Sequence, residues 1–335
     1  MKLIAGNGCI ELATNVARQL HESLIERTLT SFNDGEIRCE IDEHVRGDDV
    51  FIIQSTGRPA NDNIMELAIM ADALKRSASG RIIAVIPYYG YARQDRRPDY
   101  SRTPITSRLV ADLLQTSGVN YVVTMDIHSE QQQGFFNVPF VNLSASSVLV
   151  DDIKRNYTEY NEDLLVNELS SNITIVSPDV GGTARARAIA KKLDDAPLAI
   201  IDKRRPEPGE SEVHHIVGEV KDRICIIVDD MIDTAGTLCK GAQALKERGA
   251  KKIVAYITHP ILSGPALENI SNSALDQLVV TDTNPLSIES EIFAAETKKI
   301  RVVSVADLLS EAIHRIHNNK SISAIYDLNE NQAAE

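Results

Sequence analysis

Short apolar segments alternate with longer amphipathic segments along the whole chain. The runs of apolar and β-branched residues that have the length of strands are Leu3–Ala5, Val50–Gln54, Arg81–Ile86, Tyr121–Met125, Ile173–Val176, Leu198–Ile201, Ile224–Val228, Ile253–Ile257, Gln277–Thr281 and Ile300–Val303. Several, such as IIAVI and ICIIV, are apolar at every position, which is typical of strands buried on both faces of a parallel sheet. Helical spacing of apolar residues is found between them, in Glu11–Leu20, Asn63–Lys75, Thr106–Gln115, Ala184–Leu193 and Thr237–Arg248. This alternation predicts βαβ units and an α/β fold.

One polar segment interrupts the pattern. Asp151–Asn172 is weakly patterned and separates two similar halves of the chain. We therefore expect two α/β domains, residues 1–145 and 146–310, followed by a C-terminal segment, residues 311–335. The length of 335 residues is sufficient for two domains of medium size.

Composition and charge exclude several classes of protein. Hydrophobic residues make up 43% and charged residues 25%, as in globular proteins, and no apolar run approaches the roughly 20 residues that a membrane-spanning helix needs. The N-terminus lacks the apolar core of a signal peptide. The four cysteines are scattered without a Cys-x-x-Cys pair, which suits the reducing cytoplasm. The net charge of −13 argues against nucleic acid as a partner.

The segment after the Ile224–Val228 strand combines acids with a Thr/Gly-rich turn. It reads DDMIDTAGT over residues 229–237 and precedes a helical segment. Thr234 and Thr237 offer hydroxyl groups, Gly236 allows close approach of the backbone, and a helix N-terminus supplies N–H donors, so together they predict a phosphate site. Asp229 and Asp230 would repel phosphate but could accept hydrogen bonds from sugar hydroxyls one group away. A sugar phosphate has both parts.

A simpler interpretation of this segment is a strand end followed by an N-cap threonine. A lone Asp-Thr-x-Gly-Thr sequence fits that interpretation equally well. The acidic pair that precedes it favours the sugar phosphate.

The loop resembles that of the type I phosphoribosyltransferase group, and further motifs narrow the resemblance to class I ribose-phosphate pyrophosphokinase, also called phosphoribosyl pyrophosphate synthetase. These motifs occur in order from about Lys2 to Asp327: FNDGE at 32–36, VRGDDVFIIQST at 45–56, YYGYARQDR at 88–96, MDIHSEQQQGFF at 125–136, SPDVGG at 177–182, DKRRPE at 202–207 and THPILSGPA at 258–266. The resemblance implies two tandem type I phosphoribosyltransferase-like domains, each a mainly parallel sheet flanked by helices.

The same resemblance implies a reaction and its site residues. The diphosphoryl group of Mg-ATP is transferred to the anomeric hydroxyl of ribose 5-phosphate, which gives 5-phosphoribosyl 1-diphosphate and AMP for nucleotide biosynthesis. Lys203 would be the catalytic lysine and Arg205 its companion, next to a Pro/Gly/Glu-rich segment suited to a loop that closes over the polyphosphate. Ribose 5-phosphate would bind to the loop from Asp229 to Thr237, with these residues: Asp229, Asp230, Asp233, Thr234, Ala235, Gly236 and Thr237.

The resemblance also implies the nucleotide and metal sites. ATP would contact Arg93 and Gln94 and, from a neighbouring subunit, the FNDGE residues Phe32, Asp34, Gly35 and Glu36. His128 and Asp179, each after an apolar strand, would hold Mg²⁺. By this resemblance the protein is a homo-oligomer, a hexamer. Its composition predicts no membrane partner. For FNDGE an ordinary turn is an additional interpretation, because Asn-Asp-Gly is a strong turn signal.

Two other functions remain as alternatives. A nucleobase phosphoribosyltransferase would share the 229–237 loop but would need neither FNDGE nor the ATP segment at Arg93. A non-catalytic, synthetase-like regulatory subunit would be favoured by loss of Lys203 or of the acidic pair, and all three residues are present.

Overall fold

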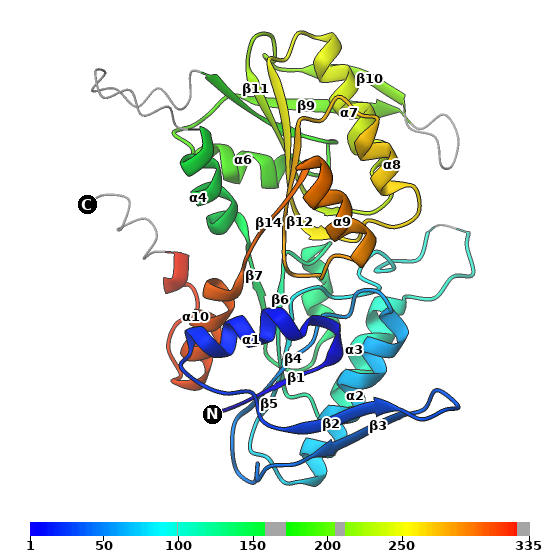
Figure 1. The fold of residues 1–335 in the computed structure, drawn as a ribbon, viewed down its shortest axis with the longest axis vertical. Coiled ribbons are helices and arrows are strands. Elements are labelled where there is room, and N and C mark those ends of the chain that lie inside the picture. The colour runs from blue at the N-terminus through cyan, green and yellow to red at the C-terminus, as the bar shows by residue number, and fades with distance from the viewer. Residues whose placement is uncertain (99, 158–171, 205–211, 327–335) are drawn as a thin grey trace. The chain divides into compact units, whose positions relative to one another are not determined.

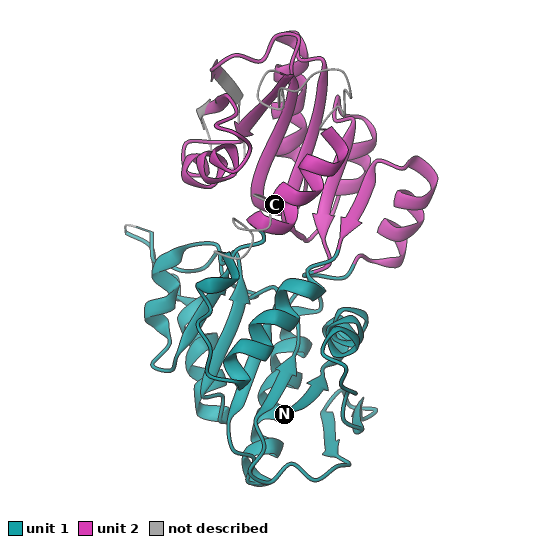
Figure 2. Cartoon of the chain, turned by 90° about the vertical axis from the view of Figure 1, so that its left-hand side faces the viewer, with its two compact units in different colours: residues 1–145, 283–285, 304–335 teal, residues 146–282, 286–303 magenta. Residues whose placement is uncertain are grey.

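The chain folds into two units, each built on its own sheet (Figures 1 and 2). The computed structural model describes residues 1–98, 100–157, 172–204 and 212–326. Unit 1 consists of Met1–Ala145, Thr283–Pro285 and Ser304–Glu335, and unit 2 of Ser146–Asp282 and Leu286–Val303. The chain therefore passes from one unit to the other four times.

Unit 1 is organised around a parallel sheet whose strand order is β1-β4-β5-β6-β7. These strands are β1 (Lys2–Ala5), β4 (Val50–Ile53), β5 (Ile82–Ile86), β6 (Tyr121–Met125) and β7 (Phe140–Leu143). A separate antiparallel hairpin is formed by β2 (Arg27–Ser31) and β3 (Ile37–Ile41). The helices are η1 (Asn7–Cys9), α1 (Ile10–Gln19), α2 (Ala60–Arg76), α3 (Thr106–Ser117), η2 (Glu130–Phe135) and α10 (Ala306–His317).

The side chains of the unit 1 strands point alternately to two helical layers. Ile82, Ala84 and Ile86 of β5 belong to a core that includes residues of α2 and α3. Ile83 and Val85, between them, are also without exposed surface, and α1 and α10 pack against each other in the same unit. A strand that is covered on both faces needs apolar residues at every position, which is why the sequence of β5 shows no alternation.

Unit 2 is organised around a seven-stranded sheet in the order β10-β9-β8-β11-β12-β13-β14, in which only β10 is antiparallel. Its strands are β8 (Ile173–Ser177), β9 (Leu198–Arg204), β10 (Glu212–Val217), β11 (Ile224–Ile232), β12 (Lys252–Pro260), β13 (Gln277–Thr281) and β14 (Ile300–Val303). Its helices among the described residues are α4 (Ser146–Tyr157), α6 (Thr183–Lys191), α7 (Gly236–Glu247), α8 (Ala266–Ser271) and α9 (Ile288–Thr297). Helices α7 and α8 share a core with alternate residues of β11 and β12.

The predicted α/β fold is confirmed, and each predicted strand corresponds to an observed one. Among the described elements, the strands that the sequence did not predict are β2, β3, β7 and β10, and the missed helices are η1, η2, α4, α8, α9 and α10. The hairpin strands are only partly buried, and β7 and β10 lie at sheet edges. Such strands carry mixed side chains, so the run of apolar residues that marks a central strand is lacking.

The first residues of the polar segment Asp151–Asn172 do not interrupt the secondary structure, because residues up to Tyr157 belong to α4. Asp152 is buried there, and its Oδ1 accepts a hydrogen bond of 2.8 Å from Arg301 Nη1. Tyr256 donates its hydroxyl to Asp152 Oδ2 at 2.7 Å. Residues of α4, β14 and β12 are joined by this buried polar cluster, whose members satisfy one another.

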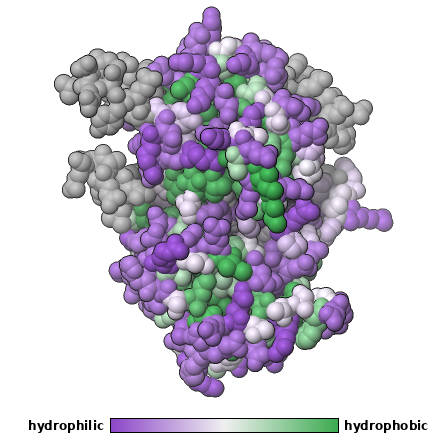
Figure 3. All heavy atoms as spheres, in the orientation of Figure 1, coloured by the Kyte–Doolittle hydropathy of each residue, from purple (hydrophilic) through white to green (hydrophobic). Residues whose placement is uncertain are grey.

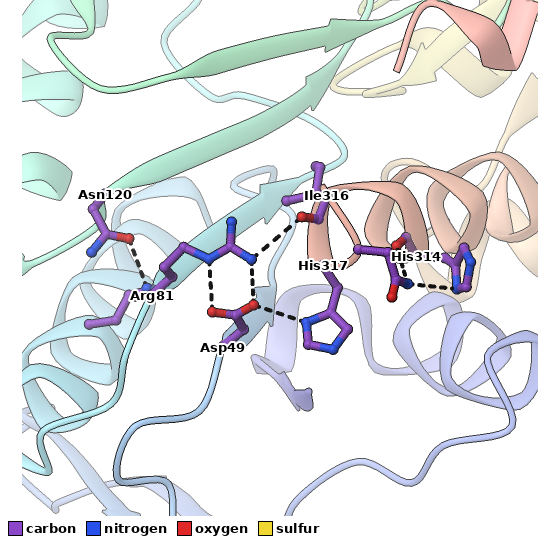
Figure 4. Close-up of polar contacts among 8 residues, drawn as sticks. Asp49, Arg81, Asn120, His314, Ile316 and His317 are labelled. Carbon is purple, nitrogen blue, oxygen red and sulfur yellow. Dashed lines mark hydrogen bonds and ion pairs between the residues drawn. The ribbon is translucent and has the colours of Figure 1, made fainter. Parts of the chain in front are cut away.

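A second polar cluster attaches α10 to the sheet of unit 1 (Figure 4). Arg81, which precedes β5, forms a two-pronged ion pair with Asp49, in which Nε lies 2.8 Å from Oδ1. His317, at the end of α10, has Nδ1 2.9 Å from Asp49 Oδ2, and Arg81 also reaches the carbonyl of Ile316 at 3.5 Å. The Arg81 guanidinium, with a smaller contribution from His317, lowers the pKa of Asp49 from 3.8 to about 2.

The surface in view is mostly hydrophilic, with scattered hydrophobic patches (Figure 3). In the described part of the chain, no helix has both the length and the apolar character required to cross a membrane.

Replacement Asp49→Asn tests how strongly the polar cluster of α10 contributes to stability. Because the folded pKa of Asp49 lies below its ordinary value, its stabilising effect is present above about pH 4 and is lost as the pH falls through about 2. We expect the variant to be less stable at pH 7 by about 2 kcal/mol, and to unfold like the parent near pH 2. Thermal or denaturant unfolding at several pH values measures this difference.

The matched control for this variant is Asp72→Asn, which breaks an exposed ion pair between Asp72 and Arg76 on α2. Exposed pairs of this kind contribute little to stability, so its unfolding should match that of the parent. A stability loss for Asp49→Asn that does not change between pH 7 and pH 2 would show that the ion pair is not the cause.

Candidate functional site

The strand order of unit 2 changes direction between β8 and β11. From β8 the chain continues to β9 on one side of the sheet, and it later enters β11 on the other side of β8. At such a switch point the two loops after these strands diverge and leave a crevice at the carboxyl ends of the strands, where α/β proteins bind ligands. The loops concerned are residues 178–182 and 233–235. In unit 1 the sheet order matches the chain order, so its described strands contain no switch point.

The acidic pair lies within a strand and not, as the sequence predicted, in the loop after it. Strand β11 continues to Ile232 and stays paired with β12, with Asp229 opposite Ile257 and Met231 opposite His259. The residues on either side of Asp230 thus keep the register with β12, and the two neighbouring carboxylates both reach the same side chain, that of Arg185. Asp230 is buried and Asp229 is about one-third exposed, with 30% of its side chain accessible.

The turn after β11 leads directly into a helix. Ala235 adopts a left-handed conformation with φ of 61°, and α7 begins at Gly236. The side chains of Thr234 and Thr237 are exposed. Apart from its chain neighbours and the backbone of α7, the nearest atom to a Cβ added to Gly236 would be Asn269 Nδ2 at 3.9 Å, an ordinary van der Waals distance. The N–H groups of a first helical turn and exposed hydroxyls are the groups that bind anions such as phosphate at helix N-termini.

Residues of the THPILSGPA segment hold this turn in place. The Ser263 hydroxyl contacts Asp233 Oδ1, and the Ser263 amide donates to the Asp233 carbonyl at 3.1 Å. The Asn269 side chain, from α8, donates to the Thr234 carbonyl at 2.8 Å. The turn is thus fixed from outside, which compensates for the unfavourable conformation of Ala235.

Arg185 on α6 pairs with both acids and was not predicted from the sequence. Its Nη1 lies 3.2 Å from Asp229 Oδ1 and 3.3 Å from Asp230 Oδ1. Burial, and next the neighbouring Asp230, raise the pKa of Asp229 from 3.8 to about 8, and Arg185 opposes this shift. The two carboxyl groups can therefore accept hydrogen bonds from other donors, such as vicinal hydroxyl groups, in place of Arg185 or of a bound proton.

The loop after β8 presents Asp179 at the other side of the switch point. Asp179 is exposed, and its Oδ1 accepts a hydrogen bond of 2.9 Å from the Gly182 amide. The Ser177 hydroxyl donates to the Asp179 carbonyl at 2.6 Å. These bonds fix the turn that leads into α6.

Lys203 lies in a strand, although the strand predicted from the sequence ends at Ile201. Strand β9 extends to Arg204, and the backbone of Lys203 pairs with Val213 of β10. Arg205 lies outside the described residues. The strand therefore carries the chain to within one residue of the segment that was predicted to close over the substrate.

In unit 1 two nucleotide candidates and one metal candidate come after two neighbouring strands. Arg93 and Gln94 come after β5 and His128 after β6, and all three are exposed. Ser129, next to His128, donates to Asp95 Oδ2 at 2.6 Å, which brings the two segments together. Gln94 accepts a hydrogen bond of 2.6 Å from Thr106 at the start of α3.

The FNDGE residues form the tip of the β2–β3 hairpin (Figure 1). The Phe32 amide donates to the Glu36 carbonyl at 2.8 Å, and Gly35 has a φ of 92°, which a residue with a side chain rarely adopts. The predicted turn is thus confirmed. Phe32 is 52% exposed, so this aromatic ring is available to a ligand or to another chain.

The described residues contain no group of three or more His, Cys, Asp or Glu side chains that could hold a metal ion. His128 belongs to unit 1 and Asp179 to unit 2. Mg²⁺ prefers oxygen ligands, keeps several waters and is commonly held by one or two protein groups together with substrate phosphates. Exposed Asp179, which has one carboxylate oxygen engaged by Gly182, fits that mode of binding.

Two mainly parallel sheets between helices, with a Thr/Gly turn at the end of an acidic strand, define the class of phosphoribosyltransferase-like α/β proteins. Residues 1–118 match the family model for the N-terminal domain of ribose phosphate pyrophosphokinase, and residues 184–327 match the model for the phosphoribosyl synthetase-associated domain. The chain belongs to the ribose-phosphate pyrophosphokinase family.

Individual relatives resemble the chain over almost its full length. The ribose-phosphate pyrophosphokinase of Haemophilus ducreyi is 54% identical over 327 residues, which is 98% of this chain and 99% of the relative. That of Vibrio cholerae is 52% identical with the same coverage. The crystal structure of phosphoribosylpyrophosphate synthetase from Mycobacterium smegmatis superposes with a TM-score of 0.84 at 37% identity and covers 95% of this chain and 99% of that one.

Replacement Asp229→Asn tests the charge state of the acidic pair in the free protein. Because the folded pKa of Asp229 is raised, the contribution of this carboxyl group to stability is present below about pH 4 and is lost as the pH rises to about 8. We expect the variant to gain stability relative to the parent over this range, with the largest gain near pH 8. Thermal unfolding without ligand or metal measures the gain, and Asp222→Asn, an exposed change in the same unit, should show none. A gain that is the same at pH 4 and pH 8 would contradict the raised pKa.

Proposed function

We propose that the chain forms 5-phosphoribosyl 1-diphosphate and AMP from ribose 5-phosphate and Mg-ATP, as a transferase of nucleotide biosynthesis. The observation that supports it most is the acidic strand end followed by an anion-binding turn at the switch point of unit 2, in a chain that matches this family along 98% of its length. In this reaction the anomeric oxygen of the sugar attacks the β-phosphorus of ATP. The bond to the α,β-bridging oxygen breaks, AMP leaves, and the proton of the attacking anomeric hydroxyl group is released.

Ribose 5-phosphate binds to the turn of unit 2 in this proposal. Thr234, Gly236 and Thr237 hold the phosphate with hydroxyl and backbone N–H groups. Asp229 and Asp230 accept hydrogen bonds from the sugar hydroxyls in place of Arg185, and this fixes the direction of the anomeric oxygen. Asp233 and Ala235 shape the turn through the contact with Ser263 and the left-handed backbone.

ATP binds to unit 1 in this proposal, with Arg93 on its phosphates and Gln94 on polar edges of the base. The FNDGE tip of a neighbouring copy completes the site, with Phe32 against the adenine. Asp34 and Glu36 accept hydrogen bonds there, and Gly35 allows the turn. The exposed Phe32 at a hairpin tip supports this arrangement, because an exposed aromatic ring on a projecting turn is suited to contact with a second chain. Such a shared site requires a homo-oligomer, for which the family resemblance suggests a hexamer.

Lys203 and Arg205 supply positive charge to the transferred group. Phosphoryl transfer depends mainly on positioning and on neutralising charge at the equatorial oxygens. Both residues lie at or directly after the end of β9, whose neighbour in the sheet is β8. The carboxyl end of β9 is thus one strand away from the loop that carries Asp179.

Mg²⁺ is the proposed cofactor, held by His128 and Asp179 together with phosphate oxygens. When bound, it would neutralise charge on the diphosphoryl group and hold it in one orientation. The four cysteines form no disulfide bonds with one another, which fits a reaction in the reducing cytoplasm.

The reaction can be tested by measuring AMP. The protein is incubated with Mg-ATP in the presence and absence of ribose 5-phosphate, and its oligomeric state is measured in the same sample. We expect AMP formation that depends on the sugar and stops when the divalent metal is removed with a chelator. If an oligomeric sample forms no sugar-dependent AMP, the proposal is wrong.

Lys203→Ala tests the role of the β9 end. We expect turnover to fall by at least about a hundredfold, because the transferred group loses a charge that stabilises the transition state. Binding of ribose 5-phosphate, measured by calorimetry, should be preserved. The control Lys251→Ala removes an exposed lysine elsewhere in unit 2 and should keep full activity. Near-normal turnover in Lys203→Ala would refute the catalytic role.

A further inference from the structure

The short helix η2 of unit 1 contains three consecutive glutamines, and the middle one is completely buried. Gln131 and Gln133 are exposed, whereas Gln132 has no accessible surface. A buried primary amide is costly unless its N–H and C=O groups find partners inside the protein. The contacts of Gln132 therefore show what this amide holds in place.

Each polar atom of the Gln132 side chain has a partner. Nε2 donates to the carbonyl oxygen of Ala92 at 2.9 Å and to the hydroxyl of Ser129 at 2.9 Å. Oε1 accepts a hydrogen bond of 2.7 Å from the hydroxyl of Ser107, which is itself fully buried. The amide thus connects η2 with α3 and with the irregular segment after β5.

These bonds lie on both sides of the proposed nucleotide pair Arg93–Gln94. Ala92, which directly precedes the pair, is bound by Gln132 itself. Asp95, which comes directly after it, accepts a hydrogen bond of 2.6 Å from Ser129, the residue that Gln132 also holds. Hydrogen bonds in such a chain polarise one another in a buried environment, so Gln132 also strengthens the hold on Asp95.

The segment that carries Arg93 and Gln94 has little regular structure of its own. Between β5 and α3, the described chain contains neither helix nor strand, and Tyr91 has a φ of 63°. Its position depends on bonds from outside, such as those of Gln132 and the bond of 3.2 Å from the Ser107 amide to the Gln94 carbonyl. A methionine at position 132 would fill a similar volume without the desolvation penalty, but it could not bind the Ala92 carbonyl.

We propose that Gln132 is a positioning residue for nucleotide binding, whose buried amide fixes the backbone on both sides of Arg93–Gln94 so that both exposed side chains meet ATP in one orientation. This inference rests on the proposed function, because it takes Arg93 and Gln94 as the ATP contacts. A purely structural glutamine would support the stability of unit 1 without any selective effect on one substrate.

The test compares the kinetic constants of Gln132→Met with those of the parent. We expect KM for ATP to rise by about tenfold, since buried partners lose their hydrogen bonds and the pair is no longer held in one orientation. The KM for ribose 5-phosphate and kcat should stay within about twofold. An unchanged KM for ATP would overturn the proposal, and so would a fall in kcat alone, which is what a smaller folded fraction produces.

A milder variant keeps the test valid if Gln132→Met folds poorly. Ser129→Ala removes only the branch to Asp95, and we expect a smaller rise in KM for ATP, of about threefold. In the double variant the two effects should not multiply, because the bond from Ser129 to Asp95 is strengthened by Gln132 and the two residues share that branch. If the two increases in KM for ATP multiply, or if Ser129→Ala leaves KM for ATP unchanged, then Gln132 does not act on Asp95 through Ser129.

Gln131→Met is the matched control, because Gln131 lies beside Gln132 in the same helix, is exposed and, within the described part of the chain, has a long side-chain contact of 3.4 Å with Asp95. Its KM for ATP should equal that of the parent.

Arg93→Ala separates a failure of this inference from a failure of the proposed function. If the parent is active but Arg93→Ala leaves KM for ATP unchanged, the assigned ATP contact is wrong and the role of Gln132 falls with it. If Arg93→Ala raises KM for ATP and Gln132→Met does not, the contact stands and only the role of Gln132 is overturned.

Discussion

The pairing of β11 with β8 on one side and β12 on the other is the constraint on which unit 2 depends. Its hydrogen bonds to β12 continue past the apolar residues through Asp229 to Ile232, so the acids are held as rigidly as the core. The turn after β11 then has a fixed starting point and is clamped by Ser263 and Asn269. A strained residue such as Ala235 can persist there, and the first turn of α7 acquires a defined direction.

The protein and its phosphorylated ligands are both negatively charged, and local groups at the candidate site offset the repulsion between them. A net charge of −13 would repel a sugar phosphate and a nucleotide alike. The candidate phosphate site therefore relies on N–H groups, hydroxyls and a helix N-terminus, which attract anions independently of net charge. The acids beside it are partly neutralised, Asp229 by a raised pKa and both by Arg185.

Features that depend on local pattern could be predicted from the sequence. Strands such as β5 and β11, apolar at each core position, and the turn at Gly35 were confirmed because their signals lie within a few residues. Long-range contacts were not predictable. Nothing near Arg185 indicates that it reaches two acids more than forty positions away, and nothing in a run of three glutamines indicates which one is buried. The extension of β11 through Asp229 to Ile232 was missed because polar residues rarely continue a buried strand, and here the register with β12 overrides that tendency.

The position of helix α10 in the chain determines when unit 1 can complete its folding during synthesis. It is encoded near the end of the described chain, yet it belongs to unit 1, packs against α1 and is tied to Asp49 through His317. During synthesis the ribosome releases the strands of unit 1 long before residues 306–317 emerge. The apolar face of unit 1 that α10 covers therefore stays uncovered until the whole of unit 2 has been translated. During that interval it can bind chaperones or aggregate.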